Sequence, residues 1–285
     1  MKILIIGGDC RMQALLRHLS ERHEVSSFAT GADDKVPTQE KLWQSLPLFD
    51  TVILPLPSTR DGINVNTPQY NEKIAIKDVI EARRKKSTLL CAMLPNALIS
   101  RASECGLQVL DYYEEESFCD KNAYITAEGA LEIVMNRLQK TLRDSHHVII
   151  GGGRIARHLL LLLRGVGAKV SLLARDPHDI LWASAVGAQT VDLLGDTEKI
   201  DSSFARADAI YNTVPTRCIS ASCYGNAKKS AIYVELATKE SLAPELFGGE
   251  CVCAPALPAK YAPESAGELI CEAVTELLEN RRAIE

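Results

Sequence analysis

The stretch HVIIGGGRIA, residues 147–156, indicates the fold of the second half of the chain. A short β-strand pattern leads directly into Gly151-x-Gly153-x-x-Ala156, and an apolar helical pattern follows. The first glycine of such a loop permits a tight turn, the next lets the backbone approach a pyrophosphate, and the small third residue keeps helix and strand close. Unpaired N–H groups at the helix start favour an anion. The stretch therefore predicts a dinucleotide site formed by Gly151, Gly153, Arg154, Ile155 and Ala156, with a ligand-free βα turn as the alternative.

The residues after the next expected strand, Lys169–Ala174, bear on the choice of dinucleotide. Enzymes that use NAD place Asp or Glu at the end of this strand, where it binds the ribose. This chain instead continues with Arg175, whose guanidinium suits a 2′-phosphate and can stack on adenine. Asp176 comes one residue late and is interpreted as a turn residue before Pro177. The sequence therefore predicts NADP, and NAD stays open as the alternative.

Strand and helix patterns alternate on both sides of a central linker. In the first half we expect strands over 2–6, 24–29, 51–56, 88–93 and 108–111, and helices over 10–22, 69–85 and 97–105. In the second half we expect strands over 147–150, 169–174, 209–213, 231–236 and 251–254, and helices over 154–164, 180–187 and 265–281. Such alternation produces parallel sheets covered by helices. The predicted fold class is α/β, with two Rossmann-like parallel-sheet domains.

The expected domain boundaries follow from the linker. Residues 1–122 form an N-terminal α/β domain for substrate or partner, and its acid-rich end, Tyr112–Asn122, is predicted to be a loop. Residues 123–262 form the dinucleotide-binding domain, entered through a linker helix that starts near Thr126. Residues 263–285 form a C-terminal helix that, by analogy with two-domain dehydrogenases, packs on the first domain.

A second glycine pair, Gly7-Gly8, follows the first expected strand. It lacks the remaining small residues of the dinucleotide pattern, and Asp9 would repel a phosphate. We interpret this segment as a βα turn with Asp9 near a helix N-cap.

Composition excludes several classes of protein. A net charge of −5 over 285 residues gives no electrostatic basis for binding nucleic acid. The nine cysteines are never spaced as C-x-x-C, so we expect reduced thiols and no metal site. The apolar run at the N-terminus, Ile3–Ile6, is too short for a signal peptide, and no run approaches the ~20 residues that span a bilayer. A cytoplasmic protein without membrane contact is expected.

Loops at the carboxyl ends of the later strands are small and rich in proline: NTVP at 212–215, ELAT at 235–238 and APALPAKYAP at 254–263. Open α/β sheets bind ligands at this edge. We expect Asn212, Thr213 and Pro215 to contact the cofactor. Pro258 and Lys260 are expected to contact the substrate. The alternative is that these loops only join strands to helices.

Across nearly its whole length the chain resembles the A subunit of dipicolinate synthase from spore-forming bacteria. The segments that carry the resemblance are Ile6–Asp9, Ile53–Pro55, Thr126–Gly129, the glycine-rich loop, Asn212–Pro215 and Ala254–Gly267. The chain departs from the family pattern at Ala156, Glu235 and Glu264-Ser265, where Gly, Asp and Lys-Thr are usual.

The resemblance implies oxidation of a dihydrodipicolinate-type intermediate to dipicolinate during sporulation, with hydride passing to NADP. It also implies a second, flavoprotein-like partner, and it leaves a homo-oligomer open. A dicarboxylate substrate requires cationic groups, and Arg60 and Lys260 are the expected ones. Ser58 and Thr59, directly before Arg60, are further expected substrate contacts. Thr126 is an expected substrate contact. Aromatisation requires a base, for which Glu128 is the first candidate.

Two other interpretations stay open. The absence of an obvious His or Lys base is compatible with a nucleotide-binding partner subunit whose chemistry resides elsewhere. An enzyme similar to shikimate dehydrogenase would need a Lys–Asp pair beside the first domain, and the sequence offers no clear one.

Overall fold

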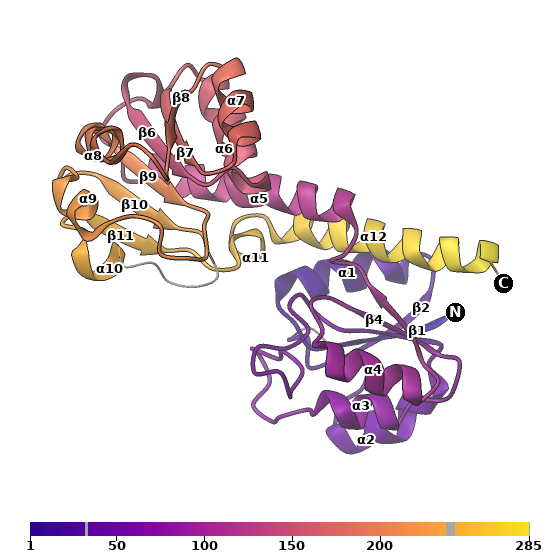
Figure 1. Cartoon of the computed structure of the whole chain (residues 1–285). Helices are drawn as coiled ribbons and strands as arrows, with labels where there is room; N and C mark the ends of the chain where they lie inside the picture. Colours follow the sequence, from indigo (N-terminus) through magenta and orange to yellow (C-terminus); the bar gives the residue numbers. More distant parts are fainter. Residues whose placement is uncertain (32–33, 238–242, 285) are drawn as a thin grey trace. The chain divides into compact units, whose positions relative to one another are not determined.

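The chain forms two compact α/β units, seen in a computed structural model that describes residues 1–31, 34–237 and 243–284 (Figure 1). The first unit contains Met1–Asn122 together with Ala262–Glu285, and the second contains Ala123–Tyr261. Helix α5 (Glu116–Met135) carries the chain from the first unit into the second. No helix in the described part of the chain is both long and apolar enough to cross a membrane.

The first unit is built on a five-stranded parallel sheet of order β2-β1-β3-β4-β5. Its strands are β1 (Lys2–Ile6), β2 (Glu24–Phe28), β3 (Thr51–Ile53), β4 (Thr88–Cys91) and β5 (Gln108–Asp111). Its helices are α1 (Cys10–Ser20), α2 (Gln39–Ser45), α3 (Ile76–Glu81), α4 (Asn96–Glu104) and α12 (Pro263–Ile284). The strand order reverses between β1 and β3, and ligands of open α/β sheets bind at such a switch point.

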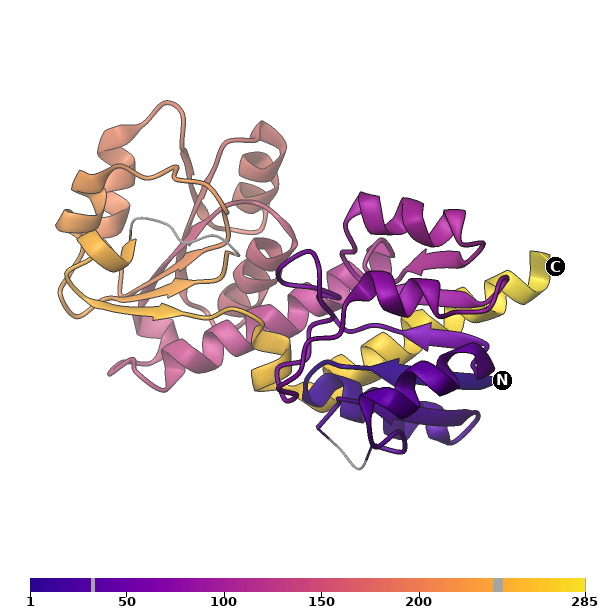
Figure 2. The same ribbon diagram turned by 90° about the horizontal axis from the view of Figure 1, so that it is seen from below.

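Helices cover both faces of this sheet: α1 and α12 one face, and α2, α3 and α4 the other (Figures 1 and 2). Because both faces are covered, the central strands are continuous apolar runs, and Ile3 to Ile6 are fully buried. The C-terminal helix packs on α1 as expected. A Cβ atom on Gly267 would lie 2.4 Å from Ala14 Cβ, so the two helices meet through a residue without a side chain.

The second unit is built on a six-stranded parallel sheet of order β11-β10-β9-β6-β7-β8, the strand order of dinucleotide-binding folds. Its strands are β6 (His146–Ile150), β7 (Lys169–Ala174), β8 (Gln189–Asp192), β9 (Ala209–Asn212), β10 (Ile232–Glu235) and β11 (Glu250–Cys253). Its helices are α6 (Arg154–Gly165), α7 (Pro177–Ala185), α8 (Thr197–Arg206), α9 (Ala221–Asn226), α10 (Ala243–Leu246) and α11 (Leu257–Tyr261). The switch point lies between β6 and β9 and places the glycine-rich loop where a ligand is expected.

Two apolar layers enclose the second sheet. One layer joins α5, α6, α7 and α11 through side chains such as Leu159, Ala183 and Leu257. The other joins α8 and α9 through Phe204 and Tyr224. The predicted class, two parallel-sheet α/β domains with the dinucleotide fold in the second, is confirmed.

One predicted helix is much shorter than expected. The helical spacing over 69–85 predicted a single helix, but α3 covers only Ile76–Glu81. The preceding residues fold into a loop closed by backbone bonds, with Val65 N donating to Ile74 O (2.8 Å) and Ile76 N donating to Ile63 O (3.0 Å). These backbone bonds replace the ones a longer helix would make.

The linker prediction was also wrong in part. The acid-rich segment predicted as a loop contains the first turns of α5, which begins at Glu116 and ends at Met135, before the expected Leu138. Phe118 explains the early start, because its ring packs edge-on against Tyr112 (5.6 Å between centroids) and is buried. The free energy gained by burying this aromatic ring outweighs the repulsion between the acidic side chains of the segment.

Candidate functional site

The glycine-rich loop joins β6 to α6 and makes a tight turn at Gly151. This residue has φ of 108°, and a Cβ atom on it would lie 2.4 Å from Thr213 Oγ1. Gly151 is therefore required by the backbone itself. The backbone N–H of Gly151 donates to Leu173 O (2.8 Å), which fixes the loop to β7.

Gly153 differs from Gly151, because the polypeptide does not require a glycine there. It is the N-cap of α6 with φ of −70°, and a Cβ atom on it would meet nothing within 4 Å. No side chain caps this helix start. A side chain on Gly153 would enter open space, and the N-terminus of a 12-residue helix such as α6 attracts anions.

The remaining loop residues lie where the pattern predicts. Ala156 is fully buried between α6 and the sheet, so its small side chain sets the helix–strand distance. Ile155 is half-buried and packs on the same apolar layer, and Arg154 is exposed at the first position of the helix. The structure thus brings the five predicted loop residues together around one helix start.

Arg175 follows directly after β7 and is exposed. Across residues 1–31, 34–237 and 243–284, no ion pair or hydrogen bond occupies its guanidinium. Asp176 is the N-cap of α7, and its carboxylate accepts from His178 N (2.8 Å). The interpretation of Asp176 as a turn residue agrees with this cap, and the carboxylate is engaged with its own helix.

The loops after β9 and β10 are held together by side chains. Asn212 is 2% exposed; its amide donates to Glu235 Oε1 (2.8 Å) and to Val214 O (3.1 Å). Thr213 Oγ1 donates to Ile150 O (2.8 Å). These contacts make a rigid edge beside the glycine-rich loop, with Pro215 exposed on it. Thr238, from the predicted loop at 235–238, lies outside the described residues.

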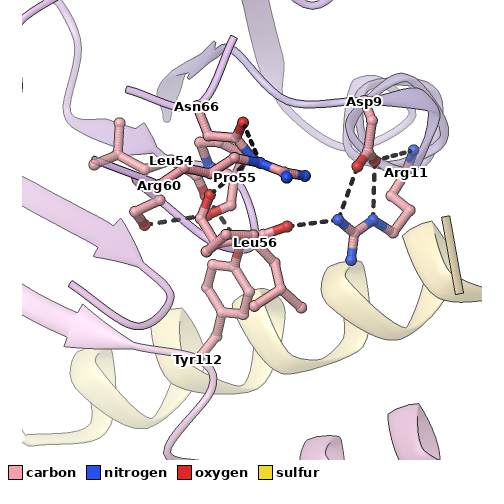
Figure 3. A network of polar contacts seen from close by, with 10 residues as sticks. Asp9, Arg11, Leu54, Pro55, Leu56, Arg60, Asn66 and Tyr112 are labelled. Carbon is pink, nitrogen blue, oxygen red and sulfur yellow. Dashed lines mark hydrogen bonds and ion pairs between the residues drawn. The ribbon is translucent and has the colours of Figure 1, made fainter. Parts of the chain in front are cut away.

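The first unit has a polar network at its own switch point (Figure 3). Arg11 donates through Nε to Asp9 Oδ1 (2.9 Å), through Nη2 to Asp9 Oδ2 (2.8 Å), and also to Leu56 O. Burial raises the pKa of Asp9, but the hydrogen bond and charge of Arg11 outweigh it and hold the pKa below its usual value. Asp9 also caps α1, as predicted, by accepting from Arg11 N. The pair ties the turn after β1 to the loop after β3.

Asn66 holds Arg60 in this network. Arg60 Nε donates to Asn66 Oδ1 (3.2 Å), and the Asn66 amide donates to Pro57 O (3.2 Å). Gly8 N donates to Asn66 O (2.9 Å). Arg60 itself is exposed, and the hydrogen bond of its Nε to Asn66 holds the guanidinium beside this loop.

A cavity of about 560 Å³ opens beside Arg60. It is lined by the loop after β3, with Arg60, Asn66, Thr67, Tyr70, Glu72 and Lys73 among the lining residues.

The two predicted substrate residues beside Arg60 have structural partners. Ser58 is fully buried; its hydroxyl donates to Pro55 O (3.1 Å) and accepts from Ala92 N (2.9 Å). Thr59 Oγ1 donates to Asp61 Oδ1 (3.1 Å) and accepts from Gly62 N (3.0 Å). Both side chains shape the loop that carries Arg60.

The other predicted substrate residues lie on α5 and α11. Glu128 is half-buried, and its hydrogen bond with the Tyr124 hydroxyl raises the pKa of that tyrosine. Thr126 and Pro258 are buried, whereas Lys260 is exposed. The two helices touch at Gly129, where a Cβ atom would lie 3.0 Å from Tyr261 Cβ.

Sequence reasoning missed several residues that organise these sites. Arg11 and Asn66 carried no recognisable signal, because each also donates to a backbone carbonyl, Leu56 O for Arg11 and Pro57 O for Asn66, and such a contact leaves no mark in the sequence. Arg157 and Asp179, which contact Gly152, were also missed. Among the described residues, His18, Glu264 and Glu268 bring three potential metal ligands within 4.8 Å, on α1 and α12. Arg17 forms an ion pair with Glu264, and His18 Nε2 lies 3.2 Å from Glu264 Oε1 and 3.6 Å from Glu268 Oε1.

A glycine-rich loop at the switch point of a sheet with this strand order is typical of dinucleotide-binding proteins. Residues 138–248 match a family described as putative NAD(P)-binding. Residues 2–113 match a family described as the N-terminal domain of the dipicolinate synthase A subunit.

The chain is similar over its full length to the A subunit of dipicolinate synthase. It is 22% identical to that protein from Bacillus subtilis (strain 168), covering 100% of this chain and 98% of the relative. The solved structure of the protein from Bacillus halodurans has a TM-score of 0.83 at 21% identity, covering 97% of both chains. That from Bacillus subtilis has a TM-score of 0.81 at 20% identity, covering 100% of this chain and 98% of the other.

Proposed function

We propose that this protein is the A subunit of a dipicolinate synthase and an NADP-dependent oxidoreductase. The observation that carries the proposal is the start of α6, which no side chain caps. Gly153 faces open space there, although the fold itself does not require a glycine at this position. The full-length similarity to the dipicolinate synthase of Bacillus subtilis supports the substrate class. The substrate is a dihydrodipicolinate-type dicarboxylate, and the product is dipicolinate.

The choice of NADP rests on Arg175. Its guanidinium stands at the end of β7, where the 2′-position of a bound adenosine ribose is expected. A charge-assisted bond to a phosphate is roughly twice as strong as one between neutral groups.

The substrate's carboxylates require cations, and we assign them to Arg60 and Lys260. Arg60 offers a guanidinium oriented by Asn66 beside a cavity, and Lys260 is exposed on α11. Ser58 and Thr59 support Arg60 through the loop. Pro258 and Thr126 help to shape the surface around Lys260 and Glu128.

Oxidation to an aromatic ring removes one hydride and one proton. The nicotinamide, when bound, accepts the hydride. Glu128 accepts the proton, because an ionised carboxylate has about four lone-pair sites and its hydrogen bond with the Tyr124 hydroxyl uses one of them. A second, flavoprotein-like subunit completes the synthase, whose product fills the developing spore.

A non-catalytic nucleotide-binding subunit is the second candidate. It is favoured by the loops after β9 and β10, where the side chains of Asn212 and Thr213 are engaged in holding the loops. Turnover assays with NADP, on this chain alone and with its partner subunit, separate the two functions. Turnover by this chain, abolished by Glu128→Gln, supports catalysis here. Nucleotide binding with turnover unaffected by any variant of this chain supports the second candidate.

A further inference from the structure

The carboxylate of Asp179 lies against the glycine-rich loop, although Asp179 belongs to α7. A Cβ atom on Gly152 would lie 2.1 Å from Asp179 Oδ2, so only glycine lets the carboxylate approach this closely. Asp179 Oδ1 accepts from Arg157 Nη2 (2.9 Å), and Arg157 Nε donates to Gly152 O (3.1 Å). We call Asp179 and Arg157 the loop clamp, since they connect α6, α7 and the loop.

The clamp is well ordered by its neighbours. The Arg157 guanidinium lies over the Trp182 ring, 5.4 Å from its centroid, which supports a cation–π contact. Asp179 is 20% exposed, and Arg157 is bound to its Oδ1 alone. An ionised carboxylate has about four lone-pair sites, so Oδ2 retains the capacity to accept from a ligand.

A ribose bound at this loop presents hydroxyl donors to its surroundings. In dinucleotide-binding folds the partner of these hydroxyls is an acid at the end of the second strand. Here that position holds Ala174 and Arg175, and Asp176 is engaged as a helix cap. Asp179 is the carboxylate that the structure places on the loop instead.

We propose that Asp179 is the acceptor for the adenosine ribose hydroxyls and that it sets the preference between NAD and NADP. The inference rests on the proposed dinucleotide site. NAD presents a free 2′-hydroxyl that donates to Asp179, whereas the 2′-phosphate of NADP brings a second negative charge beside it. Arg175 acts in the opposite sense and favours the phosphate. The ratio of the two affinities therefore reflects the balance between Asp179 and Arg175.

Asp179→Asn tests the assignment, with Asp176→Asn as the matched control. Both variants remove one negative charge from the start of α7, and Asn caps a helix as well as Asp does. Affinities for NAD and NADP are measured by calorimetry on the full chain. We expect Asp179→Asn to raise the preference for NADP over NAD about tenfold, the effect of one hydrogen bond to a charged group. Asp176→Asn should change that preference by less than about twofold.

Each result decides something. An unchanged preference in Asp179→Asn, with wild-type binding intact, overturns the ribose assignment alone. An equal loss for both nucleotides overturns it too, because the carboxylate would then act only on loop geometry. Failure of the wild-type chain to bind either nucleotide overturns the proposed function together with this inference.

Discussion

The proposed preference for NADP depends on one side chain, that of Arg175. If its guanidinium binds the 2′-phosphate, Arg175→Ala should weaken NADP binding by about 1.5–3 kcal/mol and leave NAD binding nearly unchanged. Calorimetric titration with both nucleotides measures the two effects in one preparation. Equal losses for NAD and NADP would contradict the assignment of NADP.

His147 makes stability depend on pH. It is fully buried, with its ring nitrogens bonded to Ser145 Oγ (2.7 Å) and Tyr211 Oη (3.2 Å), and burial lowers its pKa to about 4. An unfolded histidine has a pKa near 6.5, so between these values the unfolded chain binds more protons. The contribution of neutral His147 to the free energy of unfolding is therefore fully present above about pH 6.5. It should fall by roughly 3 kcal/mol as the pH drops toward 4.

Urea unfolding of wild type and His147→Gln at pH 7 and pH 5 checks this expectation. The variant should lose a large part of the pH dependence, because glutamine does not titrate. His178→Gln, at an exposed position, is the control and should retain the wild-type slope. If the His147→Gln variant keeps the full wild-type pH dependence of stability, groups other than His147 cause that dependence.

At the scale of elements, the turn from β6 into α6 is the most informative. Gly153→Val should fold normally, because the φ of −70° and the empty surroundings accept a side chain. It should abolish nucleotide binding, because the new side chain occupies the pyrophosphate's place. Gly165→Val, at the open C-terminal end of the same helix, is the control. Micromolar affinity in Gly153→Val would mean that the nucleotide binds elsewhere.

At the contact between α1 and α12, in contrast to Gly153, we predict that replacing a glycine destabilises the fold. Alanine normally stabilises a helix interior by about 1 kcal/mol relative to glycine. Gly267→Ala should instead destabilise by about 1–3 kcal/mol, because its Cβ would lie 2.4 Å from Ala14 Cβ and 2.7 Å from Arg11 O. Denaturant unfolding, with Gly165→Ala as the helix control, measures the difference. Higher stability in Gly267→Ala would show that the helices separate at no cost.

These elements also show what the sequence could predict. The buried strands and the loop at 151–156 were predictable, because a buried parallel strand is a continuous apolar run and the loop has fixed spacing. The edge strand β8 was not predicted, because only Val191 of its four residues is buried and the segment has no apolar run. The start of α5 at Glu116 was not predictable, because it depends on the packing of Phe118 against Tyr112. The Arg60–Asn66 and Arg157–Asp179 pairs escaped for a similar reason: the chain brings them together only after folding.

At the scale of the whole molecule, the two cations proposed to bind the substrate belong to different units. Arg60 belongs to the first and Lys260 to the second, and the glycine-rich loop contains neither. Arg60→Ala and Lys260→Ala should therefore each impair turnover in the reconstituted two-subunit assay, while NADP affinity stays within about twofold. Normal turnover in Arg60→Ala would reduce Arg60 to a surface residue of the kind that contributes only ~0–1 kcal/mol.

The division of the chain has a consequence for its synthesis. The second unit is inserted in sequence between two parts of the first. Helix α12, which follows this insertion, packs on α1, which precedes it. A ribosome therefore releases every residue of the nucleotide-binding unit before the first unit can bury the α1 surface around Ala14. During that interval the second unit can fold, because it is one continuous segment, whereas the apolar face of α1 in the first unit stays exposed to solvent. A chaperone that follows the nascent chain should bind longest at α1, and release should coincide with the emergence of α12.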